Sequence, residues 1–338
     1  SINPNDIGKN WVLTTVYTTG ILGMEYLGSG IVLASTSIVA GNPHILRSTD
    51  HGRIFNDSIT VPIGLTFISS ISYLGNGIVV FGTSGAVGGH IWRSTDFGLT
   101  FTDLGAISAF DILTIKYLGH GYAIAGDAGN SVQRSVNFGA TWPLAIVLAN
   151  AIQTISYLDN GIAIVGDNNG HIWRSTTIFT GFPSFSDRGD VTGTNTILVS
   201  SSYLGNGVVI VTTGNGHIIR STDFGLNWTD LGLISASFFS TSTYLGNGVA
   251  ICGAFNGHIW RSTDYGLNWT DIVGITASTL TYDTLKHIGN GAIVVGDNAG
   301  NIFRSDVSYK LDESIQDIER PIRTITASET ITKGDETL

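Results

Sequence analysis

The sequence has 338 residues, of which 42% are hydrophobic and only 12% are charged, so we expect most of the chain to fold. The formal net charge of −10 disfavours a nucleic-acid partner, because such a partner requires clustered lysine and arginine. No apolar run approaches the ~20 residues of a membrane helix, which argues against membrane insertion, and the single cysteine, Cys252, excludes an internal disulfide framework.

The first expected strand covers residues 10–16. The stretch from Asp6 to Trp11 has the Asp-x-Gly-x-x-Trp spacing of a turn that recurs complete at 264–269. The last repeat of the chain stops after Ser305 and lacks this half of the turn. We therefore expect the N-terminal strand to complete the last sheet, which would close a ring and remove exposed sheet edges.

Two markers recur seven times along the chain. One is the run Tyr-Leu-Gly-Asn-Gly or a close variant, which starts at Tyr26, Tyr73, Tyr117, Tyr157, Tyr203, Tyr244 and His287. The other is an arginine that precedes a turn: Arg47, Arg93, Arg134, Arg174, Arg220, Arg261 and Arg304. Successive arginines stand 40 to 46 residues apart, and a repeat of this length with several strands indicates a β-propeller.

Each repeat contains four short strands. In the sixth repeat we expect them at residues 240–244, 249–253, 258–262 and 268–272. The Asn-Gly pair of the first marker joins the first two strands in a tight hairpin, because it tolerates positive φ at both central positions. Apolar residues show no helical spacing over a useful length. The sequence therefore predicts an all-β fold, a seven-bladed β-propeller of four-stranded blades that covers residues 1–310.

The turn between the third and fourth strands has the pattern Ser-x-Asp-x-Gly-x-x-aromatic. It is complete at residues 48–55, 94–101, 221–228 and 262–269, carries Asn137 in place of the acid, and is broken after Ser175. This pattern resembles the Asp box (BNR repeat) of the sialidase-like propellers. The resemblance implies that the box aspartates form turns on the face away from the ligand site, while the aromatic residue packs between blades. These structural aspartates are Asp6, Asp50, Asp96, Asp223 and Asp264.

Histidine opens the third strand in five repeats: His44, His90, His171, His217 and His258. Tryptophan follows two residues later in three of them: Trp92, Trp173 and Trp260. Their place after a glycine-rich loop predicts that they lie near the face opposite the Asp boxes, where the histidines would hydrogen-bond sugar hydroxyls beside the tryptophans. The alternative is that histidine caps the loop and tryptophan packs between blades. One histidine per blade spaces the ligands too far apart for one metal ion, so we expect no metal and no cofactor.

Candidate catalytic residues are few. A sialidase holds its substrate carboxylate with three arginines, whereas the seven marker arginines share one repeat position and are interpreted as structural, bonded to backbone or turn oxygens. A glycosidase requires two carboxylates. The candidate acids at strand ends or in loops are Asp111, Asp127, Asp167, Asp283 and Asp297. Three of them, Asp127, Asp167 and Asp297, share one repeat position with Thr36, Thr83 and Thr213. A position shared by Asp and Thr indicates loop capping, so we expect no catalytic residue.

The composition changes after Lys310. Residues 311–338 are rich in Glu, Asp, Thr and Ile and lack the repeat, so we expect a separate C-terminal tail. Its ending, from Ile322 to Leu338, resembles the start of the trailing domains of phage tail fibres and tail spikes. That resemblance implies a location in a virion or outside the cell, and a homotrimer; an ordinary flexible tail is the alternative.

The sequence thus predicts a non-catalytic recognition module that binds a cell-surface glycan or a protein receptor, in a phage tail fibre or another receptor-binding protein. Two alternatives stay open. One is an assembly or scaffold propeller similar to the photosystem-assembly factors that share Asp boxes. The other is a glycoside hydrolase of the Asp-box propeller type.

Overall fold

The computed structural model describes residues 10–37, 42–61, 65–85, 88–181, 183–281, 283–289 and 291–305. The chain divides into two compact units, Ser1–Val307 and Ser308–Leu338, and all of the described residues belong to the first. The expected box residue Asp6 and the expected tail lie outside the described residues. Within the described ranges, no helix is long and apolar enough to cross a membrane.

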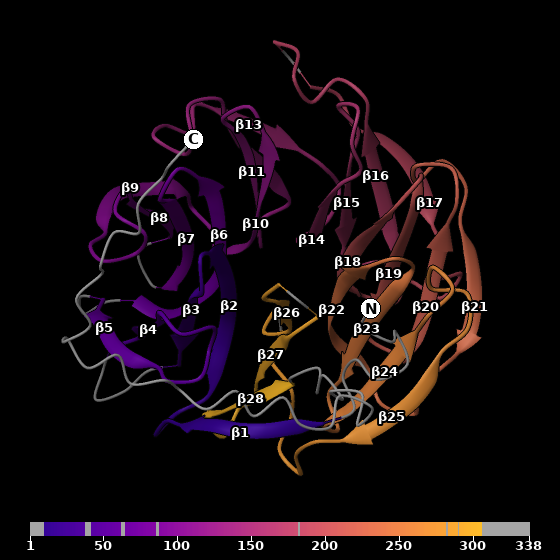
Figure 1. Cartoon of the computed structure of the whole chain (residues 1–338). Helices are drawn as coiled ribbons and strands as arrows, with labels where there is room; N and C mark the ends of the chain where they lie inside the picture. The colour runs from indigo at the N-terminus through magenta and orange to yellow at the C-terminus, as the bar shows by residue number, and fades with distance from the viewer. Residues whose placement is uncertain are drawn as a thin grey trace, which may run out of the picture. The chain divides into compact units, whose positions relative to one another are not determined.

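The first unit is a ring of seven four-stranded antiparallel sheets, or blades (Figure 1). Blade 1 consists of β2 (Ile21–Gly28), β3 (Ile31–Thr36), β4 (His44–Ser48) and β5 (Asn56–Thr60). Blade 2 consists of β6 (Leu65–Gly75), β7 (Ile78–Gly85), β8 (Gly89–Ser94) and β9 (Thr102–Ser108). Blade 3 consists of β10 (Ile112–Gly119), β11 (Tyr122–Asp127), β12 (Ser131–Ser135) and β13 (Leu144–Val147). Blade 4 consists of β14 (Ile152–Tyr157), β15 (Ala163–Asp167), β16 (His171–Ser175) and β17 (Ser186–Asp190). Blade 5 consists of β18 (Leu198–Gly205), β19 (Val208–Thr213), β20 (His217–Ser221) and β21 (Thr229–Leu233). Blade 6 consists of β22 (Phe239–Gly246), β23 (Val249–Ala254), β24 (His258–Ser262) and β25 (Thr270–Gly274). Blade 7 consists of β26 (Lys286–His287), β27 (Ile293–Gly296), β28 (Asn301–Ser305) and β1 (Trp11–Val16). This arrangement confirms the predicted all-β, seven-bladed β-propeller.

The N-terminal strand closes the ring in blade 7. β1 pairs antiparallel with β28, with Trp11 opposite Ser305. The Thr14 hydroxyl also donates a hydrogen bond to the carbonyl of Ile302 at 3.1 Å. The expectation that the opening residues complete the last blade is therefore confirmed. Because the closing strand covers the outer edge of β28, it joins the first and last parts of the propeller and leaves that edge paired.

The hydrophobic core lies between adjacent blades. The second strand of each blade has a neighbouring blade on both of its faces, which explains why every residue of β19 and β23 is buried. Between blades 1 and 2, Leu33 and Ile45 pack against Ile71 and Phe81. The thiol of Cys252 on β23 is buried, and burial raises its pKa. This confirms that the cysteine belongs to the core, where a thiol is unreactive.

The Asp boxes form tight turns, as the resemblance implies. In blade 2, the N–H of Gly98 donates to Ser94 Oγ at 2.9 Å, and the N–H of Leu99 donates to Asp96 Oδ1 at 3.0 Å. Gly98 has a φ of 76°, and a Cβ at this position would meet Leu33 of blade 1 at 2.7 Å. The turn therefore requires glycine both for its left-handed conformation and for the close approach of the preceding blade.

The Asp box also contacts the first hairpin of its own blade. The N–H of Phe97 donates to the carbonyl of Gly77 at 2.9 Å, so boxes and hairpins share one face of the ring. The aromatic residue that ends the box packs on the preceding blade, as Trp142 does against Leu74. Its indole Nε1 donates to the carbonyl of Gly139 at 3.1 Å. The predicted packing of this aromatic residue between blades is confirmed.

Candidate functional site

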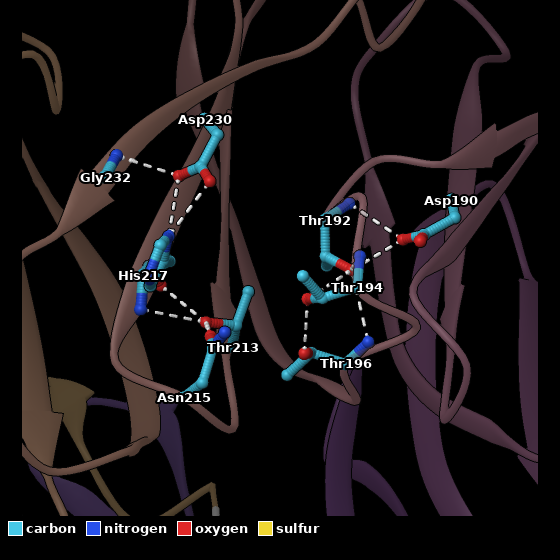
Figure 2. Close-up of polar contacts among 9 residues, drawn as sticks. All are labelled: Asp190, Thr192, Thr194, Thr196, Thr213, Asn215, His217, Asp230 and Gly232. Carbon is cyan, nitrogen blue, oxygen red and sulfur yellow. Dashed lines mark hydrogen bonds and ion pairs between the residues drawn. The ribbon is translucent and has the colours of Figure 1, made fainter.

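The predicted histidines lie on the outer half of the blades. In blade 5, His217 Nδ1 lies 2.9 Å from Asp230 Oδ2, so the pair bridges the third and fourth strands (Figure 2). The equivalent pairs are His90 with Asp103, His171 with Asp187 and His258 with Asp271. In blade 1, the ring of His44 lies beside that of Tyr17, with centroids 6.3 Å apart. Sequence reasoning missed the aspartates, although the recurring aromatic-Thr-Asp run could have revealed three of them.

The loop before each of these histidines is capped by another residue. The N–H of His217 donates to Thr213 Oγ1 at 2.9 Å, and the Thr213 hydroxyl donates to Asn215 Oδ1 at 2.6 Å (Figure 2). Asp230 accepts a further hydrogen bond from the N–H of Gly232 at 2.8 Å. The imidazole of His217 is thus held by Asp230 of the fourth strand. The sequence left open whether the histidine caps the loop, and in this blade Thr213 does so instead.

Asp190 accepts hydrogen bonds from the loop that connects blades 4 and 5 (Figure 2). Its carboxylate accepts hydrogen bonds from the N–H groups of Thr192 and Asn195, both at 2.9 Å. Burial pushes the pKa of Asp190 upward, but the hydrogen bonds outweigh this effect and lower it. The hydroxyls of Thr194 and Thr196, 2.8 Å apart, continue the chain of contacts along the loop. The loop is therefore held by its own polar groups.

The three predicted tryptophans lie between blades. Trp92 stacks on Phe81, with ring centroids 5.9 Å apart and an interplanar angle of 6°. Trp173 Nε1 donates to the buried carboxylate of Asp167 at 3.1 Å, and Trp260 belongs to the cluster between blades 5 and 6. These positions fit the packing alternative. Contact of the histidine and tryptophan columns with a ligand stays a prediction.

The aspartates considered for catalysis cap loops. Asp167 is fully buried and accepts hydrogen bonds from the N–H groups of Asn169 and His171 at 2.9 Å. It also accepts from Asn150 Nδ2 at 2.9 Å and from Trp173 Nε1. Equivalent side chains that accept from the N–H opening the third strand are Asp127, Asp297, Thr36, Thr83 and Thr213. The capping interpretation of this repeat position is confirmed.

The marker arginines join each blade to the next. Arg220 Nε donates to the carbonyl of Tyr265, inside the Asp box of blade 6, at 2.8 Å. The same contact is made by Arg47 to Phe97, Arg93 to Phe138, Arg174 to Phe224 and Arg304 to His51. Arg134 faces the broken box of blade 4 and donates instead to the carbonyl of Ile178 at 3.0 Å. The structural interpretation of these arginines is confirmed.

The inner strands enclose a central cavity of about 670 Å³, which we call the channel. Near the hairpins it is lined by the residue that precedes each Tyr or His marker: Glu25, Ser72, Lys116, Ser156, Ser202, Thr243 and Lys286. Farther from the hairpins the lining includes apolar Leu22, Leu113 and Val199 beside polar Ser69 and Gln153. The channel therefore has a polar end on the Asp-box side and a more apolar opposite end.

Hydroxyl groups bridge neighbouring blades along one part of the channel wall. Ser201 Oγ lies 2.8 Å from both Thr154 Oγ1 and Ser156 Oγ of the preceding blade. Ser242 Oγ lies 2.9 Å from Ser200 Oγ and 2.8 Å from Ser202 Oγ. These contacts satisfy polar side chains within the wall and preserve open space at its centre.

Three charged side chains form an ion-pair cluster where blades 7 and 1 meet. Lys286 Nζ lies 2.7 Å from Asp283 Oδ1 and 3.5 Å from Glu25 Oε2. Glu25 Oε1 accepts a hydrogen bond from the N–H of Tyr73 at 3.1 Å, which extends the cluster to blade 2. Burial would lower the pKa of Lys286, but Asp283 and Glu25 raise it. Burial raises the pKa of Glu25, and Lys286 only partly offsets that effect. The lysine is thus held charged by two carboxylates that share it.

Lys116 is the fourth charged group and comes from blade 3. Its side chain is solvent-exposed and lines the channel. Burial lowers the pKa of Lys116 and the positive charge of Lys286 lowers it further, while the negative charges of Glu25 and Asp283 partly offset both effects. No hydrogen bond or ion pair joins its ammonium to any residue that the structure describes. Sequence reasoning missed this group, because the residue before the Tyr marker was not examined as a repeat position.

Comparison with known proteins supports the repeat and the fold. The family model of the BNR-Asp box repeat matches residues 91–104 and 259–272, which lie in blades 2 and 6. The chain carries these repeats in a seven-bladed β-propeller. No curated protein matches the sequence. The likeness of the tail to phage tail fibres stays a prediction.

Several solved structures share the fold at low sequence identity. "YCF48 bound to D1 peptide" is 17% identical, with 91% of this chain and 99% of that chain covered and a TM-score of 0.68. YCF48 from Cyanidioschyzon merolae is 14% identical, with 87% and 98% covered and a TM-score of 0.64. The GH74 xyloglucanase from Xanthomonas campestris is 12% identical, with 86% of this chain and 53% of the enzyme covered and a TM-score of 0.66. Identities this low establish a common fold only.

Proposed function

We propose that this chain is a non-catalytic recognition module that binds a segment of a protein partner in its central channel. The observation that carries the proposal is the channel itself, a cavity of about 670 Å³ with a polar end, a more apolar end and one unpaired ammonium. Its volume lies within the roughly 300–1,000 Å³ of ordinary ligand sites. A similar propeller, YCF48, has been solved with a peptide bound, which supports a peptide as the ligand class.

The contacts of the acidic side chains support the non-catalytic part of the proposal. Asp127, Asp167 and Asp297 are fully buried and hold loop N–H groups. Glu25 and Asp283 share the ammonium of Lys286. A glycosidase needs one acid free to protonate the leaving group and a second free to act as base or nucleophile. The described carboxylates of the channel and of the capping positions are committed to other contacts.

A second candidate ligand is a cell-surface glycan, as the sequence predicted. The observation that favours it is the set of His–Asp pairs on the outer strands, because partly exposed imidazoles, such as the 42% exposed side chain of His258, offer hydrogen bonds to hydroxyl groups. The virion or extracellular location and the homotrimer belong to this version of the proposal, and they rest on the resemblance of the tail. Sedimentation of the full chain tests the trimer.

Peptide and glycan arrays, probed with the full chain and with two bulky variants, separate these ligands. Thr243→Trp narrows the channel at its polar end, whereas Thr229→Trp adds the same side chain to an exposed position on β21. We expect peptide signals that Thr243→Trp removes and Thr229→Trp preserves, with thermal unfolding confirming that both variants fold. Glycan signals that survive in both variants would contradict the channel proposal and support a site at the His–Asp pairs.

A further inference from the structure

The distribution of charge inside the propeller is uneven. Among the residues that the structure describes, the lysines are Lys116 and Lys286 and the glutamate is Glu25, and all three line the channel. They occupy a repeat position that carries serine or threonine in the other four blades. The repeat therefore tolerates a small hydroxyl here, and blades 1, 3 and 7 replace it with long charged side chains.

Two of these three charges have a structural explanation. Lys286 is paired with Asp283 and Glu25, and Glu25 also holds the backbone of Tyr73 in blade 2. This cluster ties together the inner strands of blades 7, 1 and 2. Lys116 on β10 makes no ion pair or hydrogen bond with a described residue, and the negative charges of Glu25 and Asp283 act on it only at longer range.

The environment of Lys116 favours an anion. An ammonium carries three donors and no acceptor, and no described residue accepts from that of Lys116, so its donors are available to a ligand in the channel. On the flanking inner strands the equivalent repeat positions carry Ser72 and Ser156, which are buried, so Lys116 supplies the exposed donor of this part of the wall. A carboxylate beside Lys116 would accept a hydrogen bond from the ammonium, which is the stronger, charge-assisted form of hydrogen bond.

We propose that Lys116 is the anchor for a carboxylate of an acidic peptide that enters the channel. The inference rests on the proposed function and names the chemistry of its ligand. The apolar end of the channel, with Leu22, Leu113 and Val199, accepts the aliphatic side chains that flank the acidic group. A bare inorganic anion would leave this part of the cavity unfilled, so the ligand is a peptide with apolar residues beside its carboxylate.

The test measures binding of three fluorescent probes to the full chain. The first probe is the capped peptide Ala-Leu-Asp-Leu-Ala, the second has Asn in place of Asp, and the third has Asn and a free C-terminal carboxylate. We expect a carboxylate-bearing probe to bind about tenfold more tightly than the capped Asn probe, the effect of one charge-assisted hydrogen bond. The first and third probes distinguish a side-chain carboxylate from a chain terminus.

Variants of Lys116 assign the effect to this residue. Lys116→Met should abolish the preference for a carboxylate, and Lys116→Arg should retain most of it because the positive charge is kept. Equal binding of all probes by the wild type, or a preference that survives Lys116→Met, would overturn the inference. If neutral and acidic peptides bind equally and Thr243→Trp removes both, the proposed function stands without this inference. If no probe and no array peptide binds, both are wrong.

A measurement without ligand tests the contrast between the two lysines. Lys116→Met removes an unpaired charge, so the melting temperature should stay unchanged or rise. Lys286→Met leaves Glu25 and Asp283 without their shared cation, so the melting temperature should fall. A fall for Lys116→Met as large as that for Lys286→Met would mean that Lys116 serves the fold, and the anchor role would be rejected.

Discussion

The marker arginines and the residues that precede the Tyr or His markers both recur once per blade, but the first position is invariant along the chain and the second varies. All seven arginine positions carry arginine, because each guanidinium must reach the carbonyl of the neighbouring box, as Arg220 reaches Tyr265. The channel position instead carries Glu25, Ser72, Lys116, Ser156, Ser202, Thr243 and Lys286. Five of the seven arginines make the same contact with the next blade and Arg134 makes a variant of it, whereas the channel position lines a cavity with differing side chains.

The difference separates residues that hold the blades together from residues that line the channel, where a ligand would bind. A substitution in the arginine column changes the same inter-blade contact wherever it occurs. A substitution in the channel column changes the cavity at one point of its wall. We therefore read a uniform repeat position as structural, and a departure from the repeat without a partner, such as Lys116, as a candidate for recognition.

Removal of the ring closure should have the largest effect on the structural side of this comparison. Deleting residues 1–16 takes away β1 and exposes the edge of β28. We expect the melting temperature to fall by at least about 10 °C, because the last sheet loses a strand and its packing, and we expect the exposed edge to promote self-association. Calorimetry and light scattering check both outcomes. A monomeric deletion variant with an unchanged melting temperature would show that closure is dispensable.

Loss of a buried loop cap should be the next largest effect. Asp167→Ala leaves the N–H groups of Asn169 and His171 and the donors of Asn150 and Trp173 unpaired in a buried site. We expect it to lower the free energy of unfolding by about 3 kcal/mol, measured in urea. Thr229→Ala on the exposed outer strand serves as the control and should cost less than about 0.5 kcal/mol. A neutral Asp167→Ala would contradict the capping role.

A single marker arginine should matter less. Arg220→Met removes the hydrogen bond to Tyr265 but keeps an aliphatic side chain of similar length. We expect the free energy of unfolding to fall by about 1–2 kcal/mol, while Lys116→Met, measured in parallel, should cost nothing. If the two variants lose the same stability, the division between structural and recognition positions fails.

The smallest expected effect is the pH dependence of one Asp box. Burial pushes the pKa of Asp96 upward, but hydrogen bonds from Thr100, Ser94 and Leu99 outweigh it and lower the pKa below its usual value near 3.8. The ionised carboxylate therefore stabilises the fold above the unfolded pKa, and this contribution is lost as the pH falls through the folded pKa. Asp96→Asn should flatten the decline of unfolding free energy below about pH 4.

Blade 3 shows that an asparagine at the box position is compatible with the Asp-box turn, which bears on Asp96→Asn. Asn137 occupies the box position of Asp96, and its Oδ1 accepts from the N–H of Thr141 at 3.0 Å. Asp96→Asn should therefore fold with its turn intact near neutral pH. An acid profile identical to that of the wild type would contradict the linkage between this carboxylate and stability.

Much of the fold could be predicted because its signals are local. A hairpin needs its Asn-Gly pair and an Asp box needs its serine, acid and glycine within a few residues, so both leave a readable pattern in every blade. The split box from Asp6 to Trp11 indicated which blade the first strand completes, and the pairing of β1 with β28 confirmed it. The shared position of Asp167 and Thr83 likewise identified loop caps before their hydrogen bonds were seen.

The sequence by itself thus determined the number of blades, the closure of the ring and the structural nature of the boxes, caps and arginines. The tertiary structure alone decided that Glu25, Lys116 and Lys286 meet around one cavity and that histidines pair with aspartates across outer strands. The physical reason is the separation along the chain between the residues that make each contact. Strands and turns are specified by neighbours in the chain, whereas the channel is formed by side chains from blades 1, 3 and 7, which only the closed ring brings together.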